Sequence, residues 1–162
     1  MALKIIDYGS SEYQQMVKLR DIILRKPLGL GFVPEDLEKE RDNILIAAFE
    51  DDRILGCCML VEEQPAIIRL RQMAVLNDLQ GKGIGRALMN FAENIARDRG
   101  YKIVRMHARN NSVGFYEKVG YKLGKWKNVG WWQLQLNEYL NEPAAPLKFS
   151  EITNEVMNSF IK

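Results

Sequence analysis

Cysteine and histidine are scarce in this chain of 162 residues, and their scarcity excludes two kinds of structure. The two cysteines, Cys57 and Cys58, are adjacent in an apolar run, and neighbouring residues of a strand point to opposite faces of a sheet. An ordinary disulfide between them is therefore not expected, and no further thiol offers a partner. Because His107 is the single histidine, no Cys and His set has the spacing of a zinc site, so we expect no metal.

The chain also lacks an excess of charge and any long apolar run. Lysine and arginine number 23 against 21 aspartates and glutamates, a net charge of +2. Such a balance gives no attraction to nucleic acid or to an anionic membrane surface, so neither partner is expected. No apolar run approaches the roughly 20 residues of a transmembrane helix, and no signal peptide is recognised. The expected location is cytoplasmic.

The length and an ordinary composition (47% hydrophobic, 27% charged) predict one globular domain. Residues 1–141 are expected to form this domain, and residues 142–162 a linker followed by a C-terminal amphipathic helix. Ile152, Val156 and Phe160 lie on one face of that helix. A helix this short is not stable alone, so we expect it to pack on the domain or on the other subunit of a homodimer.

Hydrophobic periodicity predicts an α/β fold in which strands and helices alternate around a mixed sheet with helices on both faces. A first helix is expected after a cap at Ser10 or Ser11 and before the break at residues 27–31. Further helices are expected at residues 34–41, at 84–99 with a stop at Gly100, and up to 118. Strands are expected at residues 4–7, 43–49, 54–61, 67–75, 102–108, near 121 and at 131–136.

The most informative block of the sequence is glycine-rich and joins the strand ending at Val75 to the helix beginning near Ile84. It reads Gln80-Gly81-Lys82-Gly83-Ile84-Gly85-Arg86. A glycine turn before a helix presents free backbone N–H groups and the positive end of the helix dipole, which together bind phosphate. A P-loop is excluded because Gly83, not Ser or Thr, follows Lys82, and no register completes a dinucleotide fingerprint. The remaining pattern is Gln-x-x-Gly-x-Gly, in which Lys82 and Arg86 add positive charge; an ordinary strand-to-helix turn is the alternative.

A second block follows about thirty residues later and reads Phe115-Tyr116-Glu117-Lys118-Val119-Gly120-Tyr121. The two blocks, in this order and at this spacing, resemble the GNAT superfamily of acetyl-coenzyme A-dependent N-acetyltransferases. The resemblance extends from about residue 43 to 124. It implies the GNAT-like fold and an acetyltransferase that moves acetyl from acetyl-coenzyme A to an amine, by direct attack in a ternary complex. The form of the chain around Asn110 is similar to an uncharacterised bacterial branch of the superfamily.

The resemblance implies which residues contact the coenzyme. In the family a bulge in the central strand frees backbone N–H groups for the acetyl carbonyl, which by position implies Met73. Arg109 stands where many relatives carry asparagine. A contact with a coenzyme phosphate and a surface position without a ligand are the two alternatives for it. The implied contacts are Met73, Ala74, Val75, Gln80, Gly81, Lys82, Gly83, Ile84, Gly85, Arg86, Arg109, Asn111, Phe115 and Tyr116.

Two proton transfers need side chains of their own. Tyr116 is the expected donor to the departing thiolate, because a phenol stays protonated at neutral pH; a core position with a satisfied hydroxyl is the alternative. Many relatives place a glutamate on the central strand as the base, and this chain has Arg71 and Gln72 there. Glu62, with its neighbour Glu63, and His107 are the candidate replacements, and transfer to water is the third route. The alternatives are a solvated turn for the two glutamates and a cleft-lining position without proton transfer for His107.

The amine acceptor is not specified by any motif. Its determinants are expected in the first helices, at residues 29–34, and at residues 125–132. The three tryptophans of the last region suit an apolar acceptor wall, and ordinary core or subunit packing is the alternative. A small amine is favoured over a protein lysine or N-terminus. The missing strand glutamate leaves one alternative of another class, a non-catalytic acyl-coenzyme A-binding sensor or regulatory module.

Overall fold

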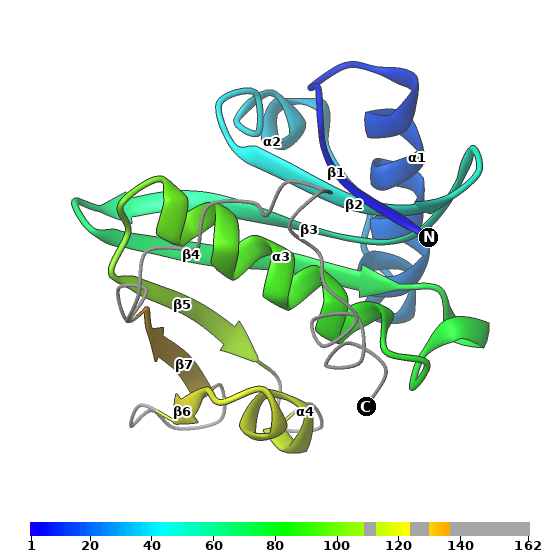
Figure 1. Ribbon diagram of the computed structural model, residues 1–162. Coiled ribbons are helices and arrows are strands. Elements are labelled where there is room, and N and C mark those ends of the chain that lie inside the picture. The colour runs from blue at the N-terminus through cyan, green and yellow to red at the C-terminus, as the bar shows by residue number, and fades with distance from the viewer. Residues whose placement is uncertain (109–112, 124–129, 137–162) are drawn as a thin grey trace, which may run out of the picture.

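One mixed sheet organises the molecule, with seven strands of the described residues in the order β1-β2-β3-β4-β5-β7-β6 (Figure 1). The computed structural model describes residues 1–108, 113–123 and 130–136. Neighbouring strands are antiparallel except for β4 and β5, which run parallel. The strands are β1 (Ala2–Ile6), β2 (Ile44–Glu50), β3 (Arg53–Gln64), β4 (Ile67–Val75), β5 (Ile103–Ala108), β6 (Lys122–Leu123) and β7 (Gly130–Gln135). The α/β mixed sheet expected from the sequence is confirmed.

Helices lie on both faces of this sheet. In Figure 1 helix α3 crosses in front of the strands, whereas α1 lies behind them. The helical segments are α1 (Ser11–Arg20), the π-helical turn η1 (Asp21–Arg25), the 3₁₀ turns η2 (Lys26–Leu28) and η3 (Asn77–Leu79), α2 (Pro34–Glu38), α3 (Ile84–Asp98) and α4 (Val113–Lys118). The C-terminal helix expected within residues 142–162 lies outside the described residues.

Two buried clusters make the core, one on each face of the sheet. Leu88 of α3 belongs to the cluster on one face, and Met16 of α1 belongs to the cluster on the other. The adjacent cysteines separate as strand alternation requires, Cys57 into the α1-side cluster and Cys58 into the α3-side cluster. Both thiols are buried and free, so the expectation that they do not pair is confirmed.

Local signals set several helix ends. The Ser10 hydroxyl caps α1 by accepting a hydrogen bond of 3.1 Å from the Tyr13 N–H. Gly100 follows α3 with φ of +84°, as expected for a stop. The first helix differs from the expectation, because its α-helical part ends at Arg20 and the chain continues through η1, which packs on β4. Short π-helical turns of this kind are rare and often occur at functional sites.

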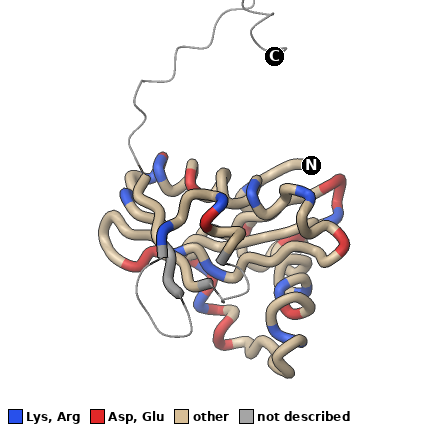
Figure 2. The backbone as a smooth tube through the Cα atoms, turned by 90° about the horizontal axis from the view of Figure 1, so that it is seen from below, with Lys and Arg blue, Asp and Glu red and all other residues tan. Residues whose placement is uncertain are grey.

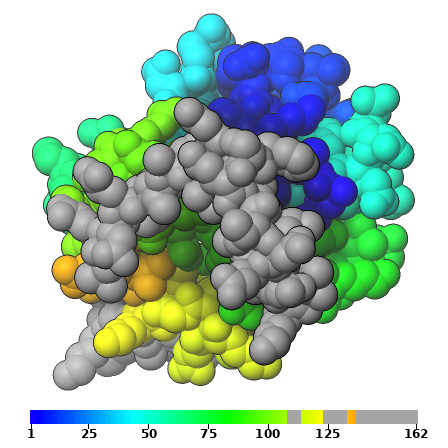
Figure 3. All heavy atoms as spheres, viewed as in Figure 1, coloured from blue at the N-terminus to red at the C-terminus, as the bar shows by residue number. Residues whose placement is uncertain are grey.

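The surface carries both signs of charge. Lys and Arg alternate with Asp and Glu along the backbone tube (Figure 2). In the space-filling view, α2 and the N-terminal residues form one end of the visible face, and the segment around α4 and β6 forms the opposite end (Figure 3). Among the described residues no helix is both long and apolar enough to span a membrane. The same residues hold no group of three or more His, Cys, Asp or Glu side chains that are placed to bind a metal ion.

Candidate active site

The central opening of the sheet comes from two parallel strands that part. β4 and β5 are paired from Ile67 with Ile103 as far as Leu70 with Met106, and the ladder ends there although β4 continues to Val75. Figure 1 shows the two strands diverging beyond this point. The backbone groups of the last five residues of β4 are therefore not paired with β5. Unpaired backbone groups of this kind are available to a ligand.

A β-bulge shapes the same end of β4. Cys57 is paired with Ala74, but Met59 is paired with Arg71, so β4 holds one residue more than β3 in this interval. Gln72, within the extra length, has a left-handed backbone with φ of +51°. A left-handed glutamine is uncommon and is held only where the surroundings enforce it. The bulge that the family resemblance implied is thus present, directly before Met73.

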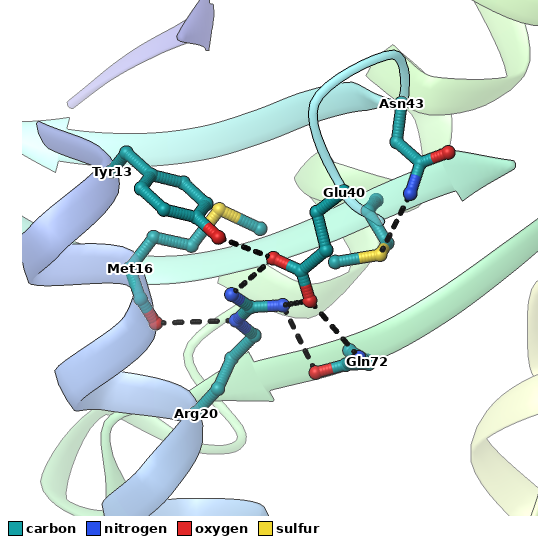
Figure 4. A network of polar contacts seen from close by, with 7 residues as sticks. Tyr13, Met16, Arg20, Glu40, Asn43 and Gln72 are labelled. Atoms are coloured by element: carbon teal, nitrogen blue, oxygen red, sulfur yellow. Dashed lines mark hydrogen bonds and ion pairs between the residues drawn. The ribbon is translucent and has the colours of Figure 1, made fainter. Parts of the chain in front are cut away.

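A buried polar network holds the bulge from the α1 side (Figure 4). The guanidinium of Arg20 donates to both carboxylate oxygens of Glu40, at 2.9 and 2.8 Å, and the same group donates to the Gln72 side-chain oxygen at 3.0 Å. The Tyr13 hydroxyl also donates to Glu40, at 2.8 Å. Arg20 is fully buried, with 0% of its surface exposed. Burial, and next the hydrogen bond to Glu40, raise the pKa of the Tyr13 phenol.

Sequence reasoning missed this network. One signal was available, since Arg20 follows Tyr13 and Met16 at helical spacing and so lies on the buried face of α1. A charge at such a position needs a buried partner of opposite sign. The sequence did not indicate that Glu40 is this partner, because it follows α2 and lies 20 residues away along the chain.

The glycine block forms the loop between η3 and α3. Gly81 and Gly83 have φ of +79° and +88°, in the region that glycine adopts without strain, and Gly83 is the N-cap of α3. The first N–H groups of α3 lack helical acceptors and face this loop. The Gln80 amide donates to the Val75 carbonyl at 3.2 Å and to the Asn77 side chain at 3.1 Å. Gln80 therefore braces the loop.

The two sequence blocks meet at Gly85. A Cβ atom on Gly85 would lie 3.3 Å from the Phe115 ring, so a larger residue here would require the ring to shift by a few tenths of an ångström. The Phe115 ring in turn packs edge-on against the Tyr116 ring, with centroids 5.0 Å apart. Tyr116 is half-buried, and burial, and next the nearby Cys58 thiol, raise the pKa of its phenol. The phenol therefore stays protonated throughout the neutral range.

These features enclose one cleft of about 660 Å³. Its walls come from η1, the end of β4, the glycine loop, the end of β5, and α4. Among the residues expected from the sequence, the cleft is lined by Met73, Ala74, Val75, Gln80, Gly81, Gly83, Gly85, Arg86, His107, Phe115 and Tyr116. Lys82 is exposed outside the lining, and the Ile84 side chain is buried in the α3-side core, which leaves only its backbone N–H for a ligand. Arg109 and Asn111 lie outside the described residues, as do residues 125–129.

The two candidate bases are placed very differently. His107 is exposed at the end of β5 and lines the cleft. Glu62 does not reach the cleft, which corrects the expectation from sequence. It is paired with Ile68 near the start of β4 and accepts a 2.6 Å hydrogen bond from the Tyr101 hydroxyl. Because β3 is antiparallel to β4, the end of β3 lies beside the start of β4, at the opposite end of the strand from the bulge. Its neighbour Glu63 forms an ion pair with Arg69.

The comparisons with known proteins agree on one family. The model of the acetyltransferase (GNAT) domain matches residues 40–123, just over half of the chain. "Uncharacterized N-acetyltransferase CT2212" of Chlorobaculum tepidum is 33% identical over 70 residues, which are 43% of this chain and 44% of that protein. "N-alpha-acetyltransferase 80" of Mus musculus is 36% identical over 66 residues, 40% of this chain and 20% of that protein. The matched part thus spans less than half of either relative.

Solved structures share the fold at low sequence identity. An aminoglycoside 6'-N-acetyltransferase complexed with coenzyme A superimposes with a TM-score of 0.75 at 17% identity, over 87% of this chain and 100% of that chain. A Bacillus subtilis acetyltransferase in complex with CoA gives a TM-score of 0.68 at 16% identity, over 83% of this chain and 98% of that chain. Because identities this low carry no information on substrates, these likenesses show the fold alone.

Proposed function

Because the chain belongs to the GNAT acetyltransferase family, we propose that it transfers the acetyl group of acetyl-coenzyme A to the primary amine of a small acceptor. The observation that supports this function is the meeting of three features in one cleft. The glycine loop before α3, the bulged and unpaired end of β4, and Tyr116 all line it. Acetyl transfer in this family accounts for all three, whereas an ordinary turn accounts only for the first.

Each part of the coenzyme has a matching group in the cleft. The pyrophosphate is proposed to lie on the N–H groups at the start of α3, where the helix dipole and Arg86 favour negative charge. The pantetheine arm is proposed to extend along the β5-side edge of β4 from Met73 to Val75, as an added strand would. Structural neighbours that were solved in complex with coenzyme A support coenzyme A as the type of ligand. The proposed chemistry needs no metal, because the backbone N–H of Met73 polarises the thioester carbonyl.

The reaction is proposed to be a direct attack of the neutral amine on the thioester carbonyl. A C–N bond forms, negative charge grows on the carbonyl oxygen, and the backbone N–H of Met73 stabilises that charge in the partly dry cleft. The C–S bond then breaks, and the departing thiolate takes the proton of the Tyr116 hydroxyl. The amine loses one proton as the amide forms. Within the described lining, His107 is the one imidazole or carboxylate side chain, the groups that commonly serve as general bases, so we assign this role to it.

One observation favours a second candidate function. The described residues of the cleft lining include no aspartate or glutamate that could act as the base. A non-catalytic module that binds acyl-coenzyme A would have no need of one. The two candidates differ in turnover, because only a transferase releases free coenzyme A thiol in the presence of an amine.

Calorimetric titration with acetyl-coenzyme A tests the ligand, with desulfo-coenzyme A and NAD as comparisons. We expect micromolar binding of both coenzyme A forms and none of NAD. Gly83→Asn and Gly83→Asp form a matched pair, since both side chains tolerate a left-handed backbone and differ in charge. Gly83→Asp should weaken binding several-fold more than Gly83→Asn, because its carboxylate lies where the phosphates bind. Absence of acetyl-coenzyme A binding by the folded wild type would refute both candidates.

An amine panel with thiol detection then separates the two. Transfer to any amine supports the transferase. Tight binding of acetyl-coenzyme A without thiol release, over a panel that includes amino acids, polyamines, aminoglycosides and peptides, supports the sensor.

A further inference from the structure

Arginine side chains gather on one face of the parting strands. Leu70 of β4 and Met106 of β5 are paired and pack into the α3-side core. The residues that alternate with them therefore point to the opposite face, on which α1 and η1 lie. Arg69 and Arg105 are cross-strand partners on that face, and Arg71 and His107 follow them at the next same-face positions.

Among these arginines, Arg71 is the one that the described residues leave available to bind a ligand. Arg69 is in an ion pair with Glu63, and Arg105 is half-buried. Arg71 is exposed, lines the cleft, and has no hydrogen-bond or ion-pair partner among the described residues. The other arginine of the described lining, Arg86, lies in the first turn of α3 at the coenzyme end. Among the described residues, the end of the cleft lining at Arg71 thus carries a positive charge that no carboxylate of the lining balances.

The position of Arg71 relates this charge to the reacting atoms. Arg71 and Met73 flank Gln72, the left-handed residue of the β-bulge, and both line the cleft. A small acceptor can therefore place one of its groups on the Arg71 guanidinium and its amine at the thioester carbonyl beside Met73. Across the cleft the lining residues from η1 are Ile23 and Leu24, which are apolar.

We infer that the acceptor is an amino carboxylate with an apolar side chain, whose carboxylate binds Arg71 while its amine attacks the thioester. This inference rests on the proposed function and names its substrate class. The planar guanidinium matches a carboxylate with two parallel hydrogen bonds. A polycationic acceptor is disfavoured, because it would bring like charge against Arg71 with no carboxylate in the described lining to offset it.

Matched acceptor pairs test this class. Leucine and phenylalanine are compared with leucinamide and phenylalaninamide, alongside one aminoglycoside, by following coenzyme A thiol release. The carboxylate member of each pair should have the higher kcat/KM, by about tenfold to a hundredfold. The amide's amine is less basic and so is more often neutral, a bias that works against the expected result.

Two charge-removing variants make the comparison specific. In Arg71→Gln the ratio of kcat/KM within each pair should fall to near one. Arg99→Gln removes one positive charge at the far end of α3, at an exposed position, and should leave the ratio unchanged. Arg71→Lys should restore part of the ratio, because it keeps the charge without the planar fork.

The outcomes separate this inference from the proposed function. Transfer to amines with equal rates within each pair, or with preference for the carboxamide or the aminoglycoside, overturns the amino carboxylate acceptor and leaves acetyl transfer standing. A carboxylate preference that persists in Arg71→Gln overturns the role of Arg71. Absence of transfer to every amine overturns the proposed transferase and this inference with it.

Discussion

Tyr116 is the residue whose surroundings bear most directly on catalysis. It lines the cleft on α4, beside Phe115, and burial raises the pKa of its phenol above the ordinary value of about 10. A raised pKa keeps the proton on the donor, so the donor form is complete at neutral pH. The same shift makes the phenol a weaker acid, yet in the proposed reaction the thiolate takes its proton as the C–S bond breaks.

Tyr116→Phe is expected to lower kcat by about a hundredfold or more while coenzyme A binding changes little. Steady-state kinetics and calorimetry of the same variant measure both quantities. Tyr101→Phe is the matched control, since its hydroxyl is bonded to Glu62 away from the cleft. Because the protonated phenol is the active form and its pKa is raised, the wild-type kcat should show no alkaline loss from this group below pH of about 10. An unchanged kcat in Tyr116→Phe would remove the residue from the mechanism.

The two cysteines are expected to be chemically silent in the folded protein. Burial raises the pKa of the Cys57 thiol to about 12, and burial also raises the pKa of the Cys58 thiol. The thiolate is the reactive form, so both side chains are protonated as well as inaccessible at neutral pH. Iodoacetamide should label neither cysteine in native protein and both in urea, as followed by mass spectrometry. Labelling of the native protein, or an acetylated cysteine trapped during turnover, would contradict direct transfer.

At the scale of elements, Arg20 of α1, Glu40 after α2 and Gln72 of β4 form one network, whose contribution to stability can be measured. The pair formed by Arg20 and Glu40 is buried, and its loss leaves an uncompensated charge inside the protein. Arg20→Met is expected to lower the free energy of unfolding by about 3–5 kcal/mol, measured by urea denaturation. The double variant Arg20→Met/Glu40→Gln should lose less than the sum of the two single variants, because the second change removes the stranded charge.

The control for this cycle is the exposed pair Lys39 and Asp36, at 2.9 Å, which should contribute little to stability because solvent screens it. Strict additivity of Arg20→Met and Glu40→Gln would contradict the coupling of the buried pair. Because Gln72 loses its Arg20 donor in Arg20→Met, we also expect kcat to fall through a less ordered bulge. The contact between Arg20 and Gln72 therefore links the stability of α1 and β4 to the geometry of the proposed oxyanion site.

At the scale of the whole molecule, the domain proposed for residues 1–141 gives a prediction of its own. Leu136 packs into the α3-side cluster, and its N–H donates to the Lys102 carbonyl at 2.7 Å. A chain of residues 1–141 is therefore expected to unfold in one cooperative transition and to bind coenzyme A with the affinity of the full chain. Thermal unfolding and calorimetry of both chains measure this, and sedimentation gives their masses. Failure of the shorter chain to fold would contradict the proposed domain of residues 1–141, and a change of mass would assign the C-terminal segment to a subunit interface.

The sequence by itself determined the features that arise over a few neighbouring residues. The Ser10 cap, the left-handed Gly83 before α3, the stop at Gly100 and the opposite faces of Cys57 and Cys58 all follow from backbone geometry within one turn or one strand. The two spaced blocks also indicated the family, since their residue types are needed by one ligand and one fold.

Only the tertiary structure decided which distant residues meet. Glu62 was a plausible base until the antiparallel register placed it beside Ile68, away from the bulge. Arg20, Glu40 and Gln72 come from three elements, and no local pattern indicates that one carboxylate neutralises the arginine while an amide joins them at a left-handed residue. That Glu63 pairs with Arg69, and that Arg71 has no ion-pair partner among the described residues, likewise appears only in the folded structure. Pairing of this kind depends on distances through space, which the packing of the sheet and helices sets and the order of residues along the chain does not.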